Sequence, residues 1–281
     1  AWAGDAPEYA DDLAVIRLKI LERQGKTQEY LHLAEAEGRT QEYVVKLAQL
    51  ARIPEAVSYA LKYITVPAEF LALAGTLKDL GSIQEGLRVA EHGLGLDGHK
   101  VELAAWTRDE ALRAGQTALA LRAARIAFSS SLTLADYKAV QSLSGDNWPS
   151  LREELLQDLR SDKSTYRGQA VDIFIHEDLI DDAIAKVEAG HSYYLIKVAD
   201  AAIATRPDWV IATCKRQAEA IIDAAKAKYY EEAVQWLDRV QSASEASGRG
   251  DDFQAYLQSV MSEHSRKRNL MPMLARLRGK R

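Results

Sequence analysis

Apolar residues recur at intervals of three and four along almost the whole chain. In the stretch KYYEEAVQWLDRV, the apolar positions are Tyr229, Ala233, Trp236, Leu237 and Val240. The stretches LIDDAIAKV and SIQEGLRVAEHGL repeat this spacing, which places apolar side chains on one side of an α-helix. We find no run with a period of two, since YYLIKV continues into the helical pattern ADAAIA. The pattern predicts an all-α fold of about fifteen helices.

Prolines and glycines indicate where these helices begin and end. Pro54, Pro67 and Pro207 are each followed closely by an acidic residue and then by an apolar periodic stretch. Proline in the first helical turn loses no hydrogen bond, and an acidic residue there favours the helix dipole. Glycines between the periodic stretches are expected to end helices in the left-handed conformation. These glycines are Gly25, Gly38, Gly81, Gly115, Gly190 and Gly248.

The helices also resemble one another in sequence. GKTQEYL at 25–31 and GRTQEYV at 38–44 are near copies. A looser pattern consists of an acidic residue followed by a small one. The small residues are Ala56, Gly86, Ala120, Ala183 and Ala233, and the pattern is weaker at Ala120, which follows a leucine. A period near 34 is typical of tetratricopeptide repeats, in which a small residue lets paired helices approach closely. We therefore predict a tetratricopeptide-like α-solenoid of irregular antiparallel hairpins. It would form a single elongated array over 1–281 or, alternatively, two halves, 1–145 and 146–281.

The positive charge is concentrated at the end of the chain. Of 36 Lys and Arg residues, seven lie in 264–281, which contains no Asp or Glu, so 1–263 holds 29 basic and all 41 acidic residues. An acidic body repels phosphates, and any contact with nucleic acid would use the tail. The candidate polyanion-binding residues are Arg266, Lys267, Arg268, Arg276, Arg278, Lys280 and Arg281.

Few residues favour catalysis or a cofactor. GLGLDG at 93–98 matches the dinucleotide fingerprint, but a helical pattern precedes it instead of a strand, so we expect its glycines to stop one helix before the next begins. No two histidines have the i, i+4 spacing of a helical metal site. The acidic pairs at 11–12, 181–182 and 251–252 suit helix starts. We expect no enzyme, no metal and no cofactor; a site assembled from dispersed residues is the remaining enzymatic alternative.

The single cysteine, Cys214, lies in the partly apolar stretch WVIATCKRQ, which favours a buried structural thiol. One cysteine excludes an intramolecular disulfide and a Cys-rich zinc site within these residues. The sequence contains no run of 18 apolar residues and no signal-peptide pattern at its start. We therefore expect a cytoplasmic protein with no membrane contact.

The end of the chain, YLQSVMSEHSRKRNLMPML, resembles the C-terminal end of prokaryotic SWIM zinc-finger proteins, and the likeness extends over 226–277. The matching residues are Tyr256, Leu257, His264, Arg266, Lys267, Leu270, Met271, Pro272 and Leu274. In that family a zinc module binds DNA or protein and a helical region follows. The resemblance implies that this chain, which lacks the zinc module and an initial Met, is the C-terminal fragment of a longer protein.

The resemblance also gives the tail a structural alternative. It implies a buried face at Leu270, Met271, Met273, Leu274 and Leu277, with Pro272 starting or kinking the last helix. Arg266, Lys267 and Arg268 would then complete one helix C-terminus. We predict a non-catalytic scaffold that binds a protein or peptide in a concave groove. Tryptophans such as Trp106, Trp209 and Trp236 belong either to the core or to such a groove. The alternative function is a nucleic-acid-associated subunit that contacts phosphates through the tail.

Overall fold

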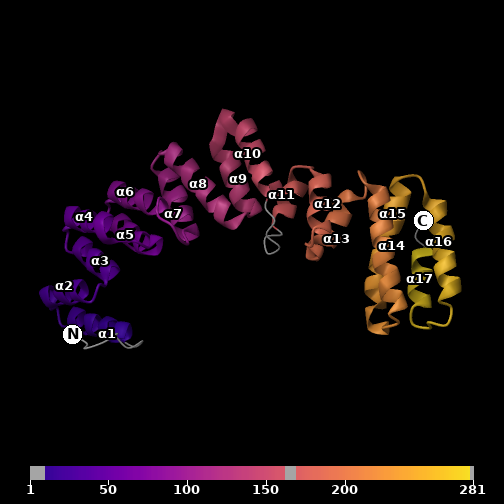
Figure 1. Cartoon of the computed structure of the whole chain (residues 1–281), viewed down its shortest axis with the longest axis horizontal. Helices are drawn as coiled ribbons and strands as arrows, with labels where there is room; N and C mark the ends of the chain where they lie inside the picture. The colour runs from indigo at the N-terminus through magenta and orange to yellow at the C-terminus, as the bar shows by residue number, and fades with distance from the viewer. Residues whose placement is uncertain (1–9, 162–168, 279–281) are drawn as a thin grey trace. The chain divides into compact units, whose positions relative to one another are not determined.

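The computed structural model describes residues 10–161 and 169–278, with side chains from Leu13 onward (Figure 1). The described residues form seventeen α-helices, three short 3₁₀ helices and the turns between them, without a strand. The predicted all-α class is confirmed. Contacts divide the chain into two units, 1–153 and 154–281, each with its own core.

The N-terminal unit consists of successive helices joined by short turns (Figure 1). Its helices are α1 (Ala10–Arg23), α2 (Thr27–Ala36), α3 (Thr40–Gln49), α4 (Ile53–Tyr63), α5 (Pro67–Asp79), α6 (Ile83–Leu94), α7 (Val101–Arg113), α8 (Thr117–Ser131) and α9 (Leu134–Ser144), followed by a 3₁₀ turn (Gly145–Asn147) and the start of α10 (Trp148–Ser161). Most of these helices pack on the next, and α3 also packs on α5, α5 on α7, and α4 on α6.

Side-chain contacts connect equivalent places in successive helix pairs. Lys78 Nζ lies 2.8 Å from Glu110 Oε1, and Gln116 Nε2 donates to Gln84 Oε1 at 2.8 Å; both pairs are 32 residues apart. Glu110 is almost fully buried, so its ion pair with Lys78 compensates for the loss of hydration. The helix pairs therefore stack in a fixed register, although the spacing varies along the unit.

The turns share one backbone motif. All six glycines predicted to end helices have positive φ, for example +69° at Gly25 and +77° at Gly81. The following N–H then donates to a carbonyl five residues earlier, as from Lys26 N to Leu21 O at 2.9 Å. The same motif occurs at two non-glycine residues, Ala51 and Asp178, which the sequence did not indicate. Ala225 also has positive φ, and its own N–H donates to Ile222 O at 3.1 Å.

One of these unpredicted turns extends the repeat seen in the sequence. Ala51 begins ARIPE, which corresponds to GKTQE and GRTQE at the two preceding turns. In all three copies the residue after the turn forms an ion pair with the glutamate three positions later. The distances are 3.3, 2.5 and 2.6 Å for Lys26–Glu29, Arg39–Glu42 and Arg52–Glu55. A 13-residue unit of turn and helix therefore occurs three times.

The small residues of the repeat pattern lie at buried contacts between helices. Ala56, Ala120, Ala183 and Ala233 are fully buried. A Cβ atom at Gly86 would lie 3.0 Å from the carbonyl oxygen of Ala74, so only glycine fits there without a shift. The expectation that Gly93 helps to stop a helix is wrong. Helix α6 continues through Gly93 to Leu94, because the missing side chain makes room for α5 and α7.

The C-terminal unit is built in the same way (Figure 1). Its helices after α10 are α11 (Ala170–His176), α12 (Ile180–Glu188), α13 (Leu195–Ala202), α14 (Pro207–Asp223), α15 (Tyr230–Ala246), α16 (Gly250–Glu263) and α17 (Met271–Arg278), with 3₁₀ turns at Ser192–Tyr194 and Ala227–Tyr229. Helices α14 and α15 make the largest contact, and α16 and α17 both pack on α15. Cys214, Leu237 and Phe253 are core residues, as is Trp236, whereas Trp209 is half-buried.

Replacing Gly93 by Ala is expected to destabilise the protein by about 1–3 kcal/mol, because the new methyl group would lie 2.8 Å from Leu103 Cδ2 and from Phe70 Cβ. Gly75→Ala is the matched control. Gly75 lies in mid-helix with nothing within 4 Å of an added Cβ, so alanine there should stabilise the protein by about 0.5–1 kcal/mol. Urea unfolding followed by circular dichroism measures both. Equal midpoints for the two variants would contradict the close approach at Gly93.

Candidate functional site

The basic residues predicted from the tail do not form one surface. Arg266, Lys267 and Arg268 lie in the turn between α16 and α17. The half-buried Lys267 donates from Nζ to the carbonyl oxygen of Ile222, in the last turn of α14. Of the three residues predicted to complete one helix C-terminus, Lys267 alone hydrogen-bonds to a helix end in the described residues, and that end belongs to α14. The Arg266 and Arg268 side chains are exposed and form no hydrogen bond or ion pair with the described residues.

Between Leu270 and Arg278 the tail follows the prediction in part. Leu270, Leu274 and Leu277 are buried, Met271 and Met273 are half-buried, and Pro272 is the second residue of α17. Arg276 and Arg278 are exposed on α17, so the basic residues of the last helix surround an apolar contact with α15 and α16. Lys280 and Arg281 lie outside the described residues.

A groove lies over α15 between the end of α13 and α17. Its volume is about 430 Å³. Its apolar lining consists of Ile203, Val234, Met273 and Leu277, of which only Leu277 is buried. The remaining α15 residues in it follow one helical stripe, from Glu231 to Ser242, which is about 16 Å long at 1.5 Å per residue.

Charges of both signs border this groove. Arg239 is held by Asp200 through two hydrogen bonds, from Nε at 2.7 Å and from Nη2 at 3.0 Å. Glu231 and Arg276 also line the groove, and neither forms an ion pair or a side-chain hydrogen bond within the described ranges. The groove thus combines an apolar floor with one acidic and one basic group that are available to a ligand.

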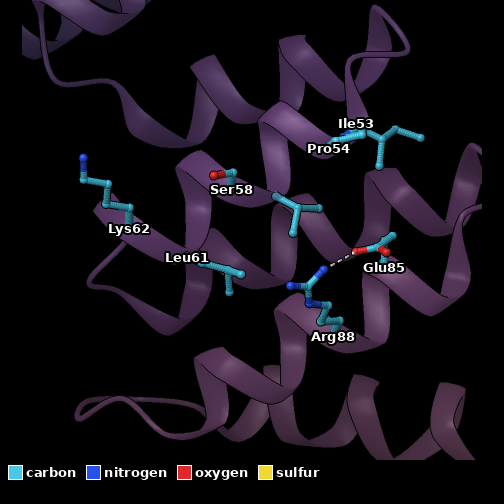
Figure 2. Close-up of a pocket in the computed structure, with 8 residues that line it drawn as sticks. Ile53, Pro54, Ser58, Leu61, Lys62, Glu85 and Arg88 are labelled. Atoms are coloured by element: carbon cyan, nitrogen blue, oxygen red, sulfur yellow. Dashed lines mark hydrogen bonds and ion pairs between the residues drawn. The ribbon is translucent and has the colours of Figure 1, made fainter.

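A second hollow, of about 530 Å³, lies between α4 and α6 in the N-terminal unit (Figure 2). Its α4 side carries Ile53, Pro54 and Leu61, and its α6 side carries Glu85 and Arg88. Figure 2 shows the Arg88 guanidinium directed toward the Glu85 carboxylate, at 3.4 Å. Lys62 also lines this hollow, and its Nζ lies 4.9 Å from the centroid of the Tyr63 ring. No unpaired acidic side chain lines the hollow within the described residues, so it lacks the two opposite unpaired charges of the groove over α15.

The cysteine thiol is structural. Cys214 is fully buried, and desolvation raises the pKa of its thiol to about 12; Asp200 also raises this pKa, whereas Arg239 opposes the shift. A neutral thiol at physiological pH is neither a nucleophile nor a metal ligand. The interpretation of Cys214 as a buried structural residue is confirmed.

The other motifs of the sequence have structural partners. Asp181 accepts hydrogen bonds from Arg206, which lowers the pKa of the Asp181 carboxyl, and Asp182 pairs with Arg160 at 3.0 Å. Asp251 and Asp252 lie in the first turn of α16, and the side chains of residues 11 and 12 are outside the described residues. Helix α6 leads into GLGLDG and includes its first two residues, so a helix stands where a dinucleotide fingerprint requires a strand.

No group of three or more His, Cys, Asp or Glu side chains in 10–161 and 169–278 is arranged to hold a metal ion. Over the same ranges, no helix has the length and apolar character needed to cross a membrane.

Comparison of the sequence with protein-family models and with curated proteins gave no match. The resemblance to the C-terminal region of SWIM zinc-finger proteins therefore stays a prediction.

Sequence reasoning missed most of the groove. Only Arg276 was a candidate residue; Ile203, Val234 and Glu231 were not. The groove is lined from three separate segments, namely the end of α13, α15 and α17, and each segment alone matches the ordinary amphipathic pattern of a surface helix. Only the packing of α13 and α17 on either side of α15 brings them to one surface.

Lys267→Ala is expected to lower the free energy of unfolding by about 1 kcal/mol, because the carbonyl of Ile222 loses a charged donor at the end of α14. Arg268→Ala is the matched control. It removes the same charge from an exposed, unpaired side chain and should change stability by less than about 0.5 kcal/mol. Urea denaturation of both variants checks the difference, and equal losses would show that Lys267 does not cap α14.

Cys214 should react with a thiol-specific disulfide reagent at pH 8 only as fast as the protein unfolds. Its raised pKa keeps the thiol protonated up to about pH 12, and its burial excludes the reagent. Labelling in 6 M urea provides the fully reactive reference. A rate at pH 8 close to that of the unfolded protein would contradict the assignment of a buried, neutral thiol.

Proposed function

We propose that this chain is a non-catalytic scaffold that binds a protein partner, and that the groove over α15 receives an amphipathic helix of that partner. The observation that carries the proposal is the open apolar floor of Ile203, Val234 and Met273 beside the unpaired charges of Glu231 and Arg276. An apolar groove with a few polar groups at its edge is a common binding site for a helix.

The dimensions of the groove fit this occupant. Its stripe along α15 is about 16 Å long, which equals three turns of an α-helix. Helices α13 and α17 border the stripe, so a docked helix would pack into a preformed depression as ridges pack into grooves. The apolar side chains of the ligand are expected at positions i, i+3 or i+4, and i+7.

The charges at the groove specify the ligand further. A basic residue of the partner would pair with Glu231, and an acidic residue would pair with Arg276. Unpaired charges at the edge of an apolar contact contribute more to orientation and partner choice than to affinity. The expected ligand is therefore an amphipathic helix with one acidic and one basic residue on the rim of its apolar face.

The arrangement of the helices supports a tetratricopeptide-like α-solenoid as the architecture of this scaffold. The supporting observations are the small buried residues of the second helices, the packing of α3 on α5 and α5 on α7, and contacts 32 residues apart. Such arrays commonly bind extended or helical ligands. As in the predicted family, the chain would be the cytoplasmic helical part of a longer protein that carries a separate zinc module.

Selection from a library of displayed helical peptides tests the proposal without a known partner. Selected peptides are expected to share an apolar i, i+3/i+4, i+7 pattern and to bind with micromolar Kd. Val234→Asp places a charge on the groove floor and should weaken their binding at least tenfold, as measured by fluorescence anisotropy.

Ser58→Asp is the matched control, because it adds the same charge in the hollow between α4 and α6. Circular dichroism confirms that both variants fold. Peptides that bind Val234→Asp as tightly as the unmodified chain, or that lose affinity only with Ser58→Asp, would contradict a ligand site over α15.

A further inference from the structure

Two basic turns meet at one end of the C-terminal unit. The first follows α14 and contains Lys226 and Lys228; the second joins α16 to α17 and contains Arg266, Lys267 and Arg268. The sequence separates them by almost 40 residues, and only the second was a candidate for binding polyanions. We call these five residues the basic end.

Contacts at the end of α14 bring the two turns together. Lys267 Nζ donates to the carbonyl oxygen of Ile222, and His264 Nε2 lies 3.8 Å from Asp223 Oδ1. The first basic turn begins directly after these two α14 residues, so the loop that carries Arg266 and Arg268 lies beside the loop that carries Lys226. Lys267 therefore positions the second turn and is less available to a ligand than its neighbours.

The other four cations of the basic end are open to solvent. Lys226, Lys228, Arg266 and Arg268 are exposed, and none has an ion pair in the described ranges. Most other arginines are engaged, as Arg206 is with Asp181 and Arg239 with Asp200. Unpaired cations that repel one another gain most when phosphates neutralise them.

Acidic and aromatic groups near this end narrow the choice of ligand. Asp223 and Glu263 lie next to the two turns, so the local excess of positive charge is modest, and Asp223 faces His264. Tyr229 is 42% exposed, and Lys228 Nζ lies 4.7 Å from its ring centroid. An exposed aromatic ring among cations is the arrangement that binds single-stranded nucleic acid, because bases stack on the ring while cations contact phosphates.

We infer that the basic end is a binding site for single-stranded nucleic acid, in which Lys226, Lys228, Arg266 and Arg268 contact phosphates and Tyr229 stacks on a base. A flexible single strand can reach both turns, and its bases are accessible for stacking. This site goes beyond the proposed scaffold function and does not depend on the groove over α15.

The test is fluorescence anisotropy with a labelled single-stranded oligonucleotide and the full chain over a salt series. If four phosphates are contacted, log K should fall with log salt at a slope of about −3, so affinity should drop about fiftyfold between 50 and 200 mM salt. The variant Lys226→Ala/Lys228→Ala/Arg266→Ala/Arg268→Ala should lose measurable binding at 50 mM salt. Lys267 is left unchanged because it supports the fold.

A charge-matched variant separates a local site from a general effect of charge. It replaces four other exposed cations that have no ion pair in the described ranges, Arg17, Lys19, Arg23 and Arg216, with Ala. This variant should retain binding within about twofold. Equal losses in the two quadruple variants, or full binding by the first of them, would overturn the inference.

Tyr229→Ala tests the kind of ligand. It should weaken binding of the single-stranded oligonucleotide at least about fivefold and leave binding of inorganic polyphosphate unchanged. Equal affinity for single-stranded and double-stranded oligonucleotides, or binding only to vesicles of anionic lipid or to an acidic peptide, would show that the basic end does not recognise single strands.

Discussion

The close approach of paired helices at small residues is the constraint on which the rest of the N-terminal unit depends. At Gly86 the backbone of α6 lies so near Ala74 that a single added carbon would contact its carbonyl oxygen at 3.0 Å. Glu85 and Arg88 flank this glycine, so the packing of α6 on α5 also fixes the two charges that border the hollow beside α4 (Figure 2). Gly86, which allows the close contact between α5 and α6, thus also determines where Glu85 and Arg88 lie.

The sequence predicted the helices well and their turns in part. The apolar period and the glycines with positive φ locate most boundaries, because only glycine adopts that conformation without a steric cost. Ala51, Asp178 and Ala225 adopt it at a cost of about 1–2 kcal/mol each, which the hydrogen bonds of the turn offset. No local pattern indicates such residues. The groove over α15 was unpredictable for a different reason: its lining depends on tertiary packing.

The basic residues of the tail are close in the sequence but lie in different surroundings in the folded chain. Seven positive charges in 18 residues suggest one electrostatic surface. In the folded chain, Lys267 closes the end of α14, Arg276 borders an apolar groove, and Arg266 and Arg268 join lysines from another turn. Neighbours in the sequence therefore have separate roles, and the residues that share a surface are distant in the sequence.

The register of the helix pairs also bears on how the chain folds. The ion pair Lys78–Glu110 and the contact Arg122–Glu91 join residues 32 and 31 positions apart, so each pair of helices needs only its neighbour in the sequence to complete its packing. Chains with such local contacts close short loops and fold quickly. The N-terminal unit has its own core, so it can become ordered during synthesis, before the C-terminal unit has left the ribosome.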